Sequence, residues 1–366
     1  MDPLIGRRAL NRATLDRQLL LGRAAKGVVE VVEHLAGLQA QTPHTWYTGL
    51  WNRIAGFDPA GASDLLRDRA LVRIALQRST IHLVSARDCL AMRPLLQPVT
   101  ERMTRTTFGR RLAGVDLDDL AATARALLEA RPMTFAELGR ALAERWPAND
   151  PHALGQGVRW LVPLVQVPPR GLWGRSGPIA HTSAESFLGF EAPPLTPAEL
   201  VRRYLAAFGP ASVADAQTWS GLTRLGEVVE SMDLVRFRDE AGRTLYDLPD
   251  APRPDADVPA PVRLMYDFDN LLLSHADRSR VITETGAAAL RGFMGANVMP
   301  RVILVDGVTA GDWTVKRAGG VSTLAVHQWE PIPVLAEVER EALELLRFLA
   351  PGDRHEIAIF TGPSRP

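Results

Sequence analysis

Two stretches decide the fold: RPMTFAELGRALAERW at residues 131–146 and GPASVADAQTWSGL at residues 209–222. Both contain the pattern Pro-x-Ser/Thr-x-Ala-Asp/Glu. In the first stretch, Thr134 precedes Glu137 by three residues, which is the spacing of a capping box at the start of a helix. The second stretch has a serine and an aspartate in the same places. Together they predict a repeated unit in which a helix begins directly after the hydroxyl residue.

Further elements flank each predicted cap. One helical stretch precedes the cap, another helix follows the capped one, and a strand, a turn and a return strand come next. These stretches are 117–130, 150–162 and VQVPPRGLWGR at 165–175 in the first copy, and 196–208, 222–232 and LVRFRDEAGRTLYDL at 234–248 in the second. Three helices followed by a hairpin is the order of a winged helix.

The first hundred residues predict a third, more divergent copy of this unit. Its predicted elements are helices near 11–25, 27–38 and 44–55, and a strand in ALQRSTIHLV at 75–84. Boundaries are expected near Gly114 and in FEAPPLTP at 190–197. The expected fold class is therefore α+β and helix-rich, with three tandem winged-helix domains. The expected domains are 1–114, 115–192 and 193–366.

The C-terminal third contains three more recognisable segments. DAPRPDADVPAPVR at 250–263 is rich in proline, which predicts a linker or crossing loop. RVILVDGVTAGDWTV at 301–315 predicts two strands joined by a turn. VLAEVEREALELLRFL at 334–349 predicts an amphipathic helix that packs back on the body and ends before Pro351.

Composition limits the classes of function. The 42 basic and 42 acidic residues give a formal net charge of zero, which argues against a nucleic-acid coat protein. No apolar run is long enough for a membrane helix, and the N-terminus lacks the apolar core of a secretory signal. We therefore expect a soluble cytoplasmic protein that does not bind membranes. Cys89 is a lone cysteine and the histidines lack zinc-ligand spacing, so neither a metal nor a cofactor is expected.

The segment HLAGLQAQTPHTWYTGLWNRI at 34–54 carries the candidate catalytic residues. Gln39 and Gln41 flank a small residue at the predicted end of an apolar helix. Pro43 disfavours helical geometry at Thr42, so both glutamines are expected near a helix end, where side chains can converge on a cleft. From the spacing alone, two solvated glutamines at a helix terminus would be the simpler interpretation.

Four segments resemble those of one protein family. They are LAGLQAQTPHTWYTGLWNRI at 35–54, QRSTIHLVSARD at 77–88, YDFDNLLLSHADRSRVI at 266–282 and ILVDGVTAGDW at 303–313. In this order they are similar to the bacterial winged-helix DNA glycosylases of the AlkZ and YcaQ type. Each motif alone is weak, whereas the ordered set covers most of the chain.

The resemblance implies both a fold and an activity. Members of the family have three tandem winged-helix domains around a DNA-binding concavity. They act as monofunctional glycosylases on N-alkylated purines, and some unhook interstrand crosslinks. Gln39-Ala40-Gln41 matches the Gln-x-Gln motif of the AlkZ type rather than the Gln-x-Asp of the YcaQ type. By this resemblance Gln39 and Gln41 are catalytic, and Thr42 belongs to the lesion-binding surface. It also implies that N7-alkylguanine or a crosslink is the substrate, removed as self-resistance to a DNA-alkylating natural product.

Glutamine amides suit this reaction. An amide accepts a proton poorly at neutral pH, but its carbonyl and NH₂ groups can orient a water molecule. Alkylation at purine N7 or N3 makes the base cationic, so the base departs readily while the sugar gains oxocarbenium character. The enzyme then has to position water near the anomeric carbon and stabilise the developing charge.

Two further groups of polar residues are candidates for lesion binding. In the segment 266–282, Asp269, Asn270 and His275 are expected in the cleft, near the lesion or its phosphates. The alternative is a strand-to-helix junction with Asp277 and Arg278 paired on the surface. Neighbours such as Ser274, His275 and Asp277 rarely assemble a hydrolase triad, so we reject that interpretation.

Arg78, Thr80 and His82 alternate, so on one strand they would share a face that could line the groove. The alternative for His82 is a satisfied histidine in a half-buried strand. The densest basic stretch is ERMTRTTFGRRL at 101–112, whose arginines could grip backbone phosphates or could simply be solvated. These arginines are Arg102, Arg105, Arg110 and Arg111.

Two other classes of function fit a repeated winged helix. A transcriptional regulator would bind an operator, usually as a dimer, but the zero net charge and the absence of a heptad segment argue against it. A non-catalytic scaffold is the third class. The expected partner is double-stranded DNA carrying alkylated or crosslinked purines, bound by a monomer. Release of a free base from alkylated DNA without metal or nucleotide would separate the glycosylase from both alternatives.

Overall fold

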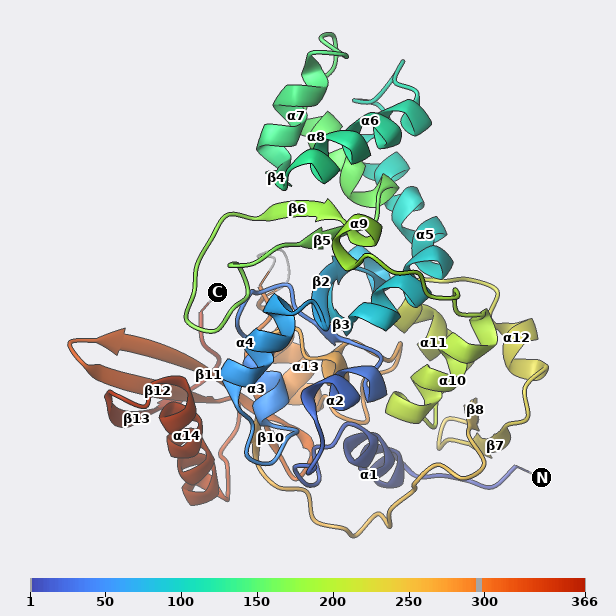
Figure 1. The fold of residues 1–366 in the computed structure, drawn as a ribbon. Coiled ribbons are helices and arrows are strands. Elements are labelled where there is room, and N and C mark those ends of the chain that lie inside the picture. Colours follow the sequence, from blue (N-terminus) through green and yellow to red (C-terminus); the bar gives the residue numbers. More distant parts are fainter. Residues whose placement is uncertain (1, 294–297, 366) are drawn as a thin grey trace.

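A computed structural model describes residues 2–293 and 298–365, and it is a helix-rich α+β structure (Figure 1). Three sheets organise the described residues: a six-stranded sheet, a five-stranded sheet and a two-stranded hairpin. No helix in the described ranges is long and apolar enough to cross a membrane. Buried apolar residues form several clusters rather than one core, which agrees with a chain built from modules.

The N-terminal part combines short helices with the first strands of the six-stranded sheet. Its elements are α1 (Arg7–Arg17), α2 (Val28–His34), β1 (Leu38–Gln39), α3 (Trp46–Trp51), α4 (Pro59–Arg67), β2 (Leu71–Ala75), the 3-10 helix η1 (Gln77–Ser79), β3 (Ile81–Ser85) and α5 (Ala86–Phe108). The first two helices are shorter than predicted. Leu19 follows α1 with φ 56°, and Ala36 and Gly37 follow α2 with φ 52° and 92°. These left-handed residues end each helix early.

The second group contains the first predicted repeat. Its elements are α6 (Leu117–Ala130), β4 (Met133–Thr134), α7 (Phe135–Ala143), α8 (Pro151–Leu161), β5 (Leu164–Gln166), β6 (Ala180–Ser183) and α9 (Ala184–Leu188). The predicted capping box is confirmed, because the Thr134 hydroxyl accepts from the Glu137 amide and the Glu137 carboxylate accepts from the Thr134 amide. The predicted return strand in 165–175 is wrong. A prolyl pair at 168–169 interrupts the ladder after β5, and the return strand is β6.

The six-stranded sheet runs through both of these parts. Its order is β1-β3-β2-β5-β6-β4, and every neighbouring pair is antiparallel. The sheet therefore crosses the position near Gly114 where a domain boundary was expected. Its β1 edge carries Gln39, so the candidate catalytic segment is anchored in this sheet.

The third group contains the second predicted repeat. Its elements are α10 (Pro197–Phe208), α11 (Val213–Ser220), α12 (Gly226–Glu230), β7 (Val235–Arg238) and β8 (Thr244–Asp247). The predicted capping box of Ser212 and Asp215 is confirmed. The predicted hairpin is also confirmed, with β7 and β8 antiparallel and Gly242 at φ 78° in the turn.

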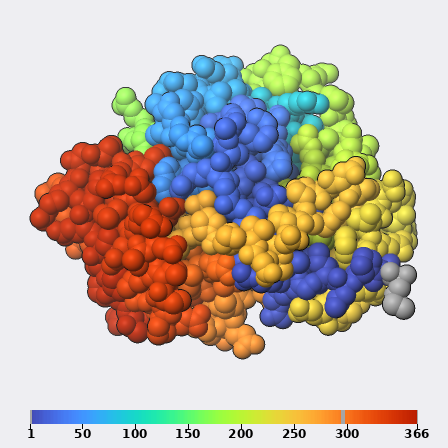
Figure 2. Space-filling view, turned by 90° about the horizontal axis from the view of Figure 1, so that it is seen from below, coloured from blue at the N-terminus to red at the C-terminus, as the bar shows by residue number. Residues whose placement is uncertain are grey.

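The C-terminal part, residues 263–361, contains the five-stranded sheet and packs against the N-terminal part. Its elements are β9 (Arg263–Leu264), η2 (Asn270–Leu272), α13 (Glu284–Arg291), β10 (Arg301–Val305), β11 (Val308–Ala318), β12 (Val321–Gln328), α14 (Leu335–Leu349) and β13 (Arg354–Thr361). The two predicted strands in 301–315 are β10 and the start of β11, and the predicted final helix is α14. Figure 2 shows the gold segment around residues 250–263 running between two blue parts of the N-terminal region toward the orange and red C-terminal part, as expected of a crossing loop.

Candidate active site

Gln39 lies on the edge strand β1 and is almost completely buried, with 3% of its surface exposed. Its side-chain Oε1 accepts a hydrogen bond from Arg78 Nη2 at 2.8 Å. Its backbone amide donates to Asn270 Oδ1 at 3.2 Å, and its carbonyl accepts from the Tyr266 hydroxyl at 3.0 Å. Gln39 is therefore held at three points by residues from two distant segments.

Gln41 is exposed, in contrast to Gln39. Its Oε1 accepts from the Ile81 backbone amide at 3.2 Å. Because an arginine and a backbone N–H can only donate, the amide oxygens of both glutamines must face these partners. The expectation that the glutamines end a helix is wrong: α2 ends at His34, and the left-handed turn that follows leads into β1. One residue further, the Thr42 hydroxyl donates to Asp267 Oδ2 at 2.6 Å.

Arg78 is the charged group nearest to this amide pair. It lies in the 3-10 helix η1 with φ 55°, a left-handed conformation uncommon for arginine. Besides Gln39, its guanidinium contacts the carbonyl of Trp219 at 2.7 Å. Burial lowers the pKa of Arg78 to about 10, so the group stays cationic at neutral pH. No carboxylate pairs with it within the described ranges.

The expectation that Arg78, Thr80 and His82 share one strand face is wrong. The 3-10 turn interrupts the strand, β3 begins at Ile81, and the Thr80 hydroxyl donates to the Gln77 carbonyl. His82 stands directly opposite Gln39 in the β1–β3 pair and is 1% exposed. Burial and the nearby Arg78 lower the pKa of His82 to about 3, so its ring is neutral at physiological pH. The buried-histidine interpretation is therefore the better one.

Asp269, Asn270 and His275 lie in the interior rather than on a cleft surface, which corrects the expectation for them. Asp269 is 0% exposed and forms a two-point ion pair with Arg53, both N–O distances being 2.9 Å. Asn270 donates to the Gly37 carbonyl at 2.6 Å and accepts from Gln39, so it holds the turn before β1. His275 is 3% exposed and bonds to a backbone carbonyl. These residues support the site without facing it.

Sequence reasoning missed another supporting residue, Arg73. It lies in β2 with 2% exposure, and its Nη2 donates to the carbonyl of Ala40, the residue between the two glutamines, at 2.8 Å. Burial lowers the pKa of Arg73 to about 10. A charged residue inside the apolar strand LVRIA was the only signal of this role. Arg73, which is buried, and Arg78, which is half-buried, thus bring two positive charges close to the Gln-x-Gln segment.

Comparison with known proteins identifies the family. A family model described as DNA glycosylase AlkZ-like matches residues 32–348, which include both glutamines and their supporting residues. The chain belongs to the AlkZ-like DNA glycosylase family. The solved structure of Streptomyces sahachiroi DNA glycosylase AlkZ is similar to this chain, with a TM-score of 0.74, 21% identity, and coverage of 97% of this chain and 99% of that one. No curated protein sequence matches.

Family membership makes the chain a DNA glycosylase, which excludes the non-catalytic regulator and scaffold. The similarity to the Streptomyces structure concerns the fold, and it extends over nearly the full length of both chains. In this glycosylase no group of three or more His, Cys, Asp or Glu residues in the described ranges could hold a metal ion. The lone Cys89 is fully buried, and burial raises its pKa to about 12.

The arginine segment of this glycosylase, defined as Arg102, Arg105, Arg110 and Arg111, is exposed at all four positions. Two of them lie near the end of α5 and the other two follow it. Arg111 is tied down, because it pairs with Asp150 at 3.3 Å and lies 4.7 Å from the ring centroid of Phe108. The other three have no ion pair among the described residues. They are therefore available to an external anion.

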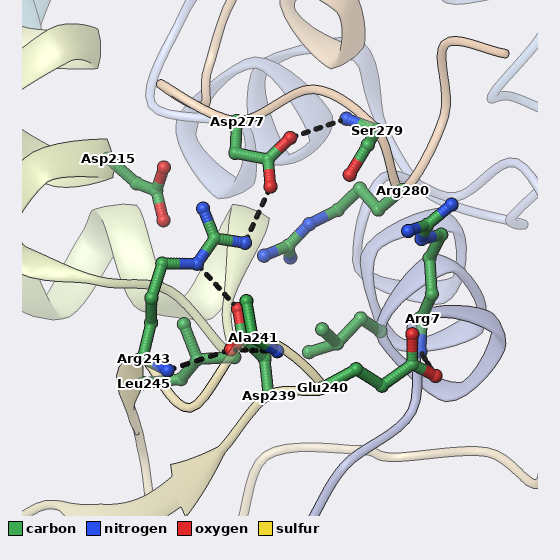
Figure 3. A pocket seen from close by; sticks show the side chains of 11 residues that line it. Arg7, Asp215, Asp239, Glu240, Ala241, Arg243, Leu245, Asp277, Ser279 and Arg280 are labelled. Carbon is green, nitrogen blue, oxygen red and sulfur yellow. Dashed lines mark hydrogen bonds and ion pairs between the residues drawn. The ribbon is translucent and has the colours of Figure 1, made fainter. Parts of the chain in front are cut away.

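A small enclosed pocket lies elsewhere, between α1 and the β7–β8 turn (Figure 3). Its volume is about 100 Å³, and its walls are mostly charged. Arg243 joins Asp239 and Asp277 there, as Figure 3 shows, so the alternative in which Asp277 pairs with Arg278 does not hold. Because Arg243 pairs with both carboxylates, this network ties the hairpin to the segment around Asp277.

Proposed function

We propose that this glycosylase hydrolyses the N-glycosidic bond of N-alkylated purines, N7-alkylguanine first among them, with Gln39 and Gln41 as its catalytic groups. One observation carries the proposal: both amide oxygens are engaged by protein donors, so both glutamines are fixed in orientation. Fixed polar groups favour catalysis because they need no reorganisation as charge develops. The Gln-x-Gln pattern supports the assignment, since it resembles the motif of the AlkZ type.

The orientation determines which groups can meet the substrate. With Oε1 of Gln39 bound to Arg78, and Oε1 of Gln41 bound to the Ile81 amide, the NH₂ groups are the free donors. Each carbonyl oxygen also keeps a second lone pair, which can accept from water. Gln41, the exposed member, holds the attacking water, while Gln39, the buried member, donates toward an acceptor atom of the departing base.

The reaction balances without a strong base. The bond between C1′ and N9 breaks, and its electron pair goes to the cationic base, which leaves neutral. The sugar becomes oxocarbenium-like, the water oxygen bonds to C1′, and the proton of that water passes to bulk solvent. His82 takes no part in proton transfer, because its pKa of about 3 keeps the ring neutral and poorly basic. Positioning and charge stabilisation then supply the rate enhancement.

We further propose that the repeated element groups are winged-helix domains arranged around the DNA. The second and third groups each place a capped second helix after a preceding helix and before a hairpin, which supports this architecture. The free arginines of the arginine segment would contact phosphates of double-stranded DNA. The enzyme would act as a monomer on alkylated or crosslinked duplexes, and crosslink unhooking would serve as self-resistance.

The test is direct. Purified enzyme is incubated with a duplex that contains one N7-methylguanine, with a chelator present, and the released base is measured by chromatography under single-turnover conditions. We expect free N7-methylguanine and an abasic strand without strand cleavage. A duplex with an interstrand N7-guanine crosslink, resolved on a denaturing gel, measures unhooking separately. Absence of base release from the methylated duplex at high enzyme concentration would refute the substrate assignment.

A further inference from the structure

A concavity adjoins the loop that follows the Gln-x-Gln segment. It encloses about 360 Å³, which is within the usual size of small-molecule sites. Its walls come from the loop after Gln41, from the turn at Trp173, from the start of the C-terminal sheet and from the end of α14. Tyr266 lines it, and the same tyrosine hydroxyl donates to the Gln39 carbonyl at 3.0 Å. One residue therefore touches both the cavity and the candidate catalytic strand.

One hydroxyl among the residues that line this cavity is left without a partner. Thr45 Oγ1 is buried and makes no hydrogen bond within the described residues, whereas the His44 ring lies within reach of the backbone of Leu172 and Arg175. Thr45 occupies the N-cap position of α3, where a threonine hydroxyl usually caps the helix, yet it makes no capping bond. Burial lowers the pKa of His44, so its ring is neutral at physiological pH. Buried polar atoms are rarely left unsatisfied, which points to a ligand.

The remaining walls are aromatic and cationic. Trp173 is held in place by Tyr47 and Phe348, with ring centroids 4.8 and 5.1 Å away. Trp313 is covered by Arg301, whose guanidinium carbon lies 5.0 Å from the ring centroid. Arg301 has no ion pair within the described ranges. Among the aromatic residues of the lining, the half-buried Trp173 can present a ring face, since Tyr266 and Trp313 are almost fully buried. An aromatic face beside an unpartnered hydroxyl and a free guanidinium matches a planar ring that carries acceptor atoms.

We propose that this cavity binds a planar ring of the lesion nucleotide, stacked against Trp173 and hydrogen-bonded by Thr45. The inference rests on the proposed function, because it assigns the ring to the substrate of the adjacent glutamines. Two sources share this chemistry: the alkylated purine itself, turned out of the duplex, or an aromatic substituent attached to that purine.

Two variants test the cavity by different means. Thr45→Val removes an unpartnered hydroxyl while keeping the shape of the side chain, so folding stability should be unchanged. Trp173→Ala removes the stacking surface but also its contacts with Tyr47 and Phe348, so its thermal stability must be measured alongside. Trp146→Ala is the matched control, because this half-buried tryptophan lies outside the cavity.

Each variant is tested on two duplexes, one with N7-methylguanine and one with N7-benzylguanine. Single-turnover excision is measured over a range of enzyme concentrations, which separates the half-saturating concentration from the maximal rate. Affinity is measured by fluorescence anisotropy on the same duplexes with a 2′-fluoro sugar, which slows base loss. We expect the half-saturating enzyme concentration to rise about fivefold in Thr45→Val and about tenfold in Trp173→Ala, for at least one of the two lesions.

The pattern of losses identifies the occupant. Losses on both lesions support the purine as the ring in the cavity, and losses on the benzyl lesion alone support the substituent. If neither Thr45→Val nor Trp173→Ala differs from Trp146→Ala in excision or in affinity for damaged duplex, the proposal is overturned. If wild-type enzyme excises neither base, the proposed function fails, and the affinity measurements alone then decide whether the cavity recognises the lesion.

Discussion

The Gln-x-Gln segment and the arginine segment prepare polar groups in opposite ways. Gln39 is held by Arg78, Asn270 and Tyr266 before any substrate arrives. The arginine segment is exposed, and most of it has no partner among the described residues. Fixed groups suit a transition state, which requires one geometry, whereas flexible arginines suit phosphates, which occur along the whole duplex. Perturbing the first should therefore change the rate, and perturbing the second should change affinity.

Acidification should have the largest effect, which is on the free energy of unfolding. It protonates buried histidines and leaves the arginines charged. Burial holds the pKa values of His82, His181 and His275 at about 3, well below the value of about 6.5 in the unfolded chain. Their contribution to stability is complete above pH 6.5 and is lost as the pH falls toward 3. Each of these histidines can lower the free energy of unfolding by up to about 1.4 kcal/mol per pH unit.

Chemical denaturation at pH 7, 6, 5 and 4.5 measures this loss, and the slope gives the protons taken up on unfolding. We expect an uptake of two to three protons between pH 6 and 4.5. An uptake below one proton would mean that these histidines are not desolvated as the structure indicates.

Replacing the candidate catalytic amides comes second. Gln39→Ala and Gln41→Ala should each slow single-turnover excision on the order of 100-fold, or ~3 kcal/mol, if each supplies a transition-state hydrogen bond. The double variant should lose far less than the product of the single losses, because the two groups act as a unit. DNA affinity should stay within about twofold. Excision at the wild-type rate by the double variant would refute the mechanism.

Arg78 combines features of the two segments, because it is an arginine whose guanidinium donates a hydrogen bond to the Gln39 side chain. Arg78→Met should slow excision about thirtyfold, because loss of a charge-assisted hydrogen bond frees the Gln39 amide to rotate. Arg78→Lys should recover part of the rate. Affinity for undamaged duplex distinguishes the roles: if it falls and the maximal excision rate does not, Arg78 is a phosphate contact rather than a positioning residue.

Charge reversal in the arginine segment should leave the maximal rate alone. Arg102→Glu together with Arg105→Glu should weaken binding to damaged and undamaged duplex about tenfold and reduce the salt slope by about two. Arg340→Glu together with Arg354→Glu, on α14 and β13, is the control for the same change in net charge. An unchanged affinity and salt slope would show that these arginines are solvated and that the grip lies elsewhere.

The sequence predicted what depends on local patterns. The capping boxes at Thr134 and Ser212, the β7–β8 hairpin and helix α14 are encoded within a few residues, and all were correct. The site was predicted only as a motif. The partners of Gln39 lie up to 231 residues away, at Asn270, and no spacing rule reaches that far.

The same limit explains the errors at the site. Asp269 appeared free in the sequence because its partner, Arg53, is 216 residues away. The alternative interpretation paired Asp277 with its neighbour Arg278, whereas the fold brings Arg243 within reach of Asp277. Ala36 has a left-handed backbone that ends α2 early and places Gln39 on strand β1, and an alanine gives no local sequence signal of this conformation. Long-range pairing and backbone conformation thus set the geometry that the motif alone left open.

The smallest effect is expected at Asp267, and it is the most informative about the chemistry. This carboxylate accepts from Thr42 through Oδ2, while its Oδ1 is buried and has no partner among the described residues. It is therefore a carboxylate bonded to the residue next to Gln41, and a candidate for a general base. Because Oδ1 is buried away from solvent, we expect it to support the Thr42 loop rather than to take a proton from water.

Asp267→Asn tests this expectation, because asparagine keeps an acceptor for Thr42 and removes the charge. Excision should fall less than about threefold, since a support role needs only the acceptor. A general base of this kind contributes about 10² to 10⁴ in rate, and its loss would also change the dependence of the rate on pH. A loss of that size with unchanged DNA affinity would show that the Asp267 carboxylate activates the attacking water as a general base. The glutamines would then be partners of Asp267 rather than the principal catalytic groups.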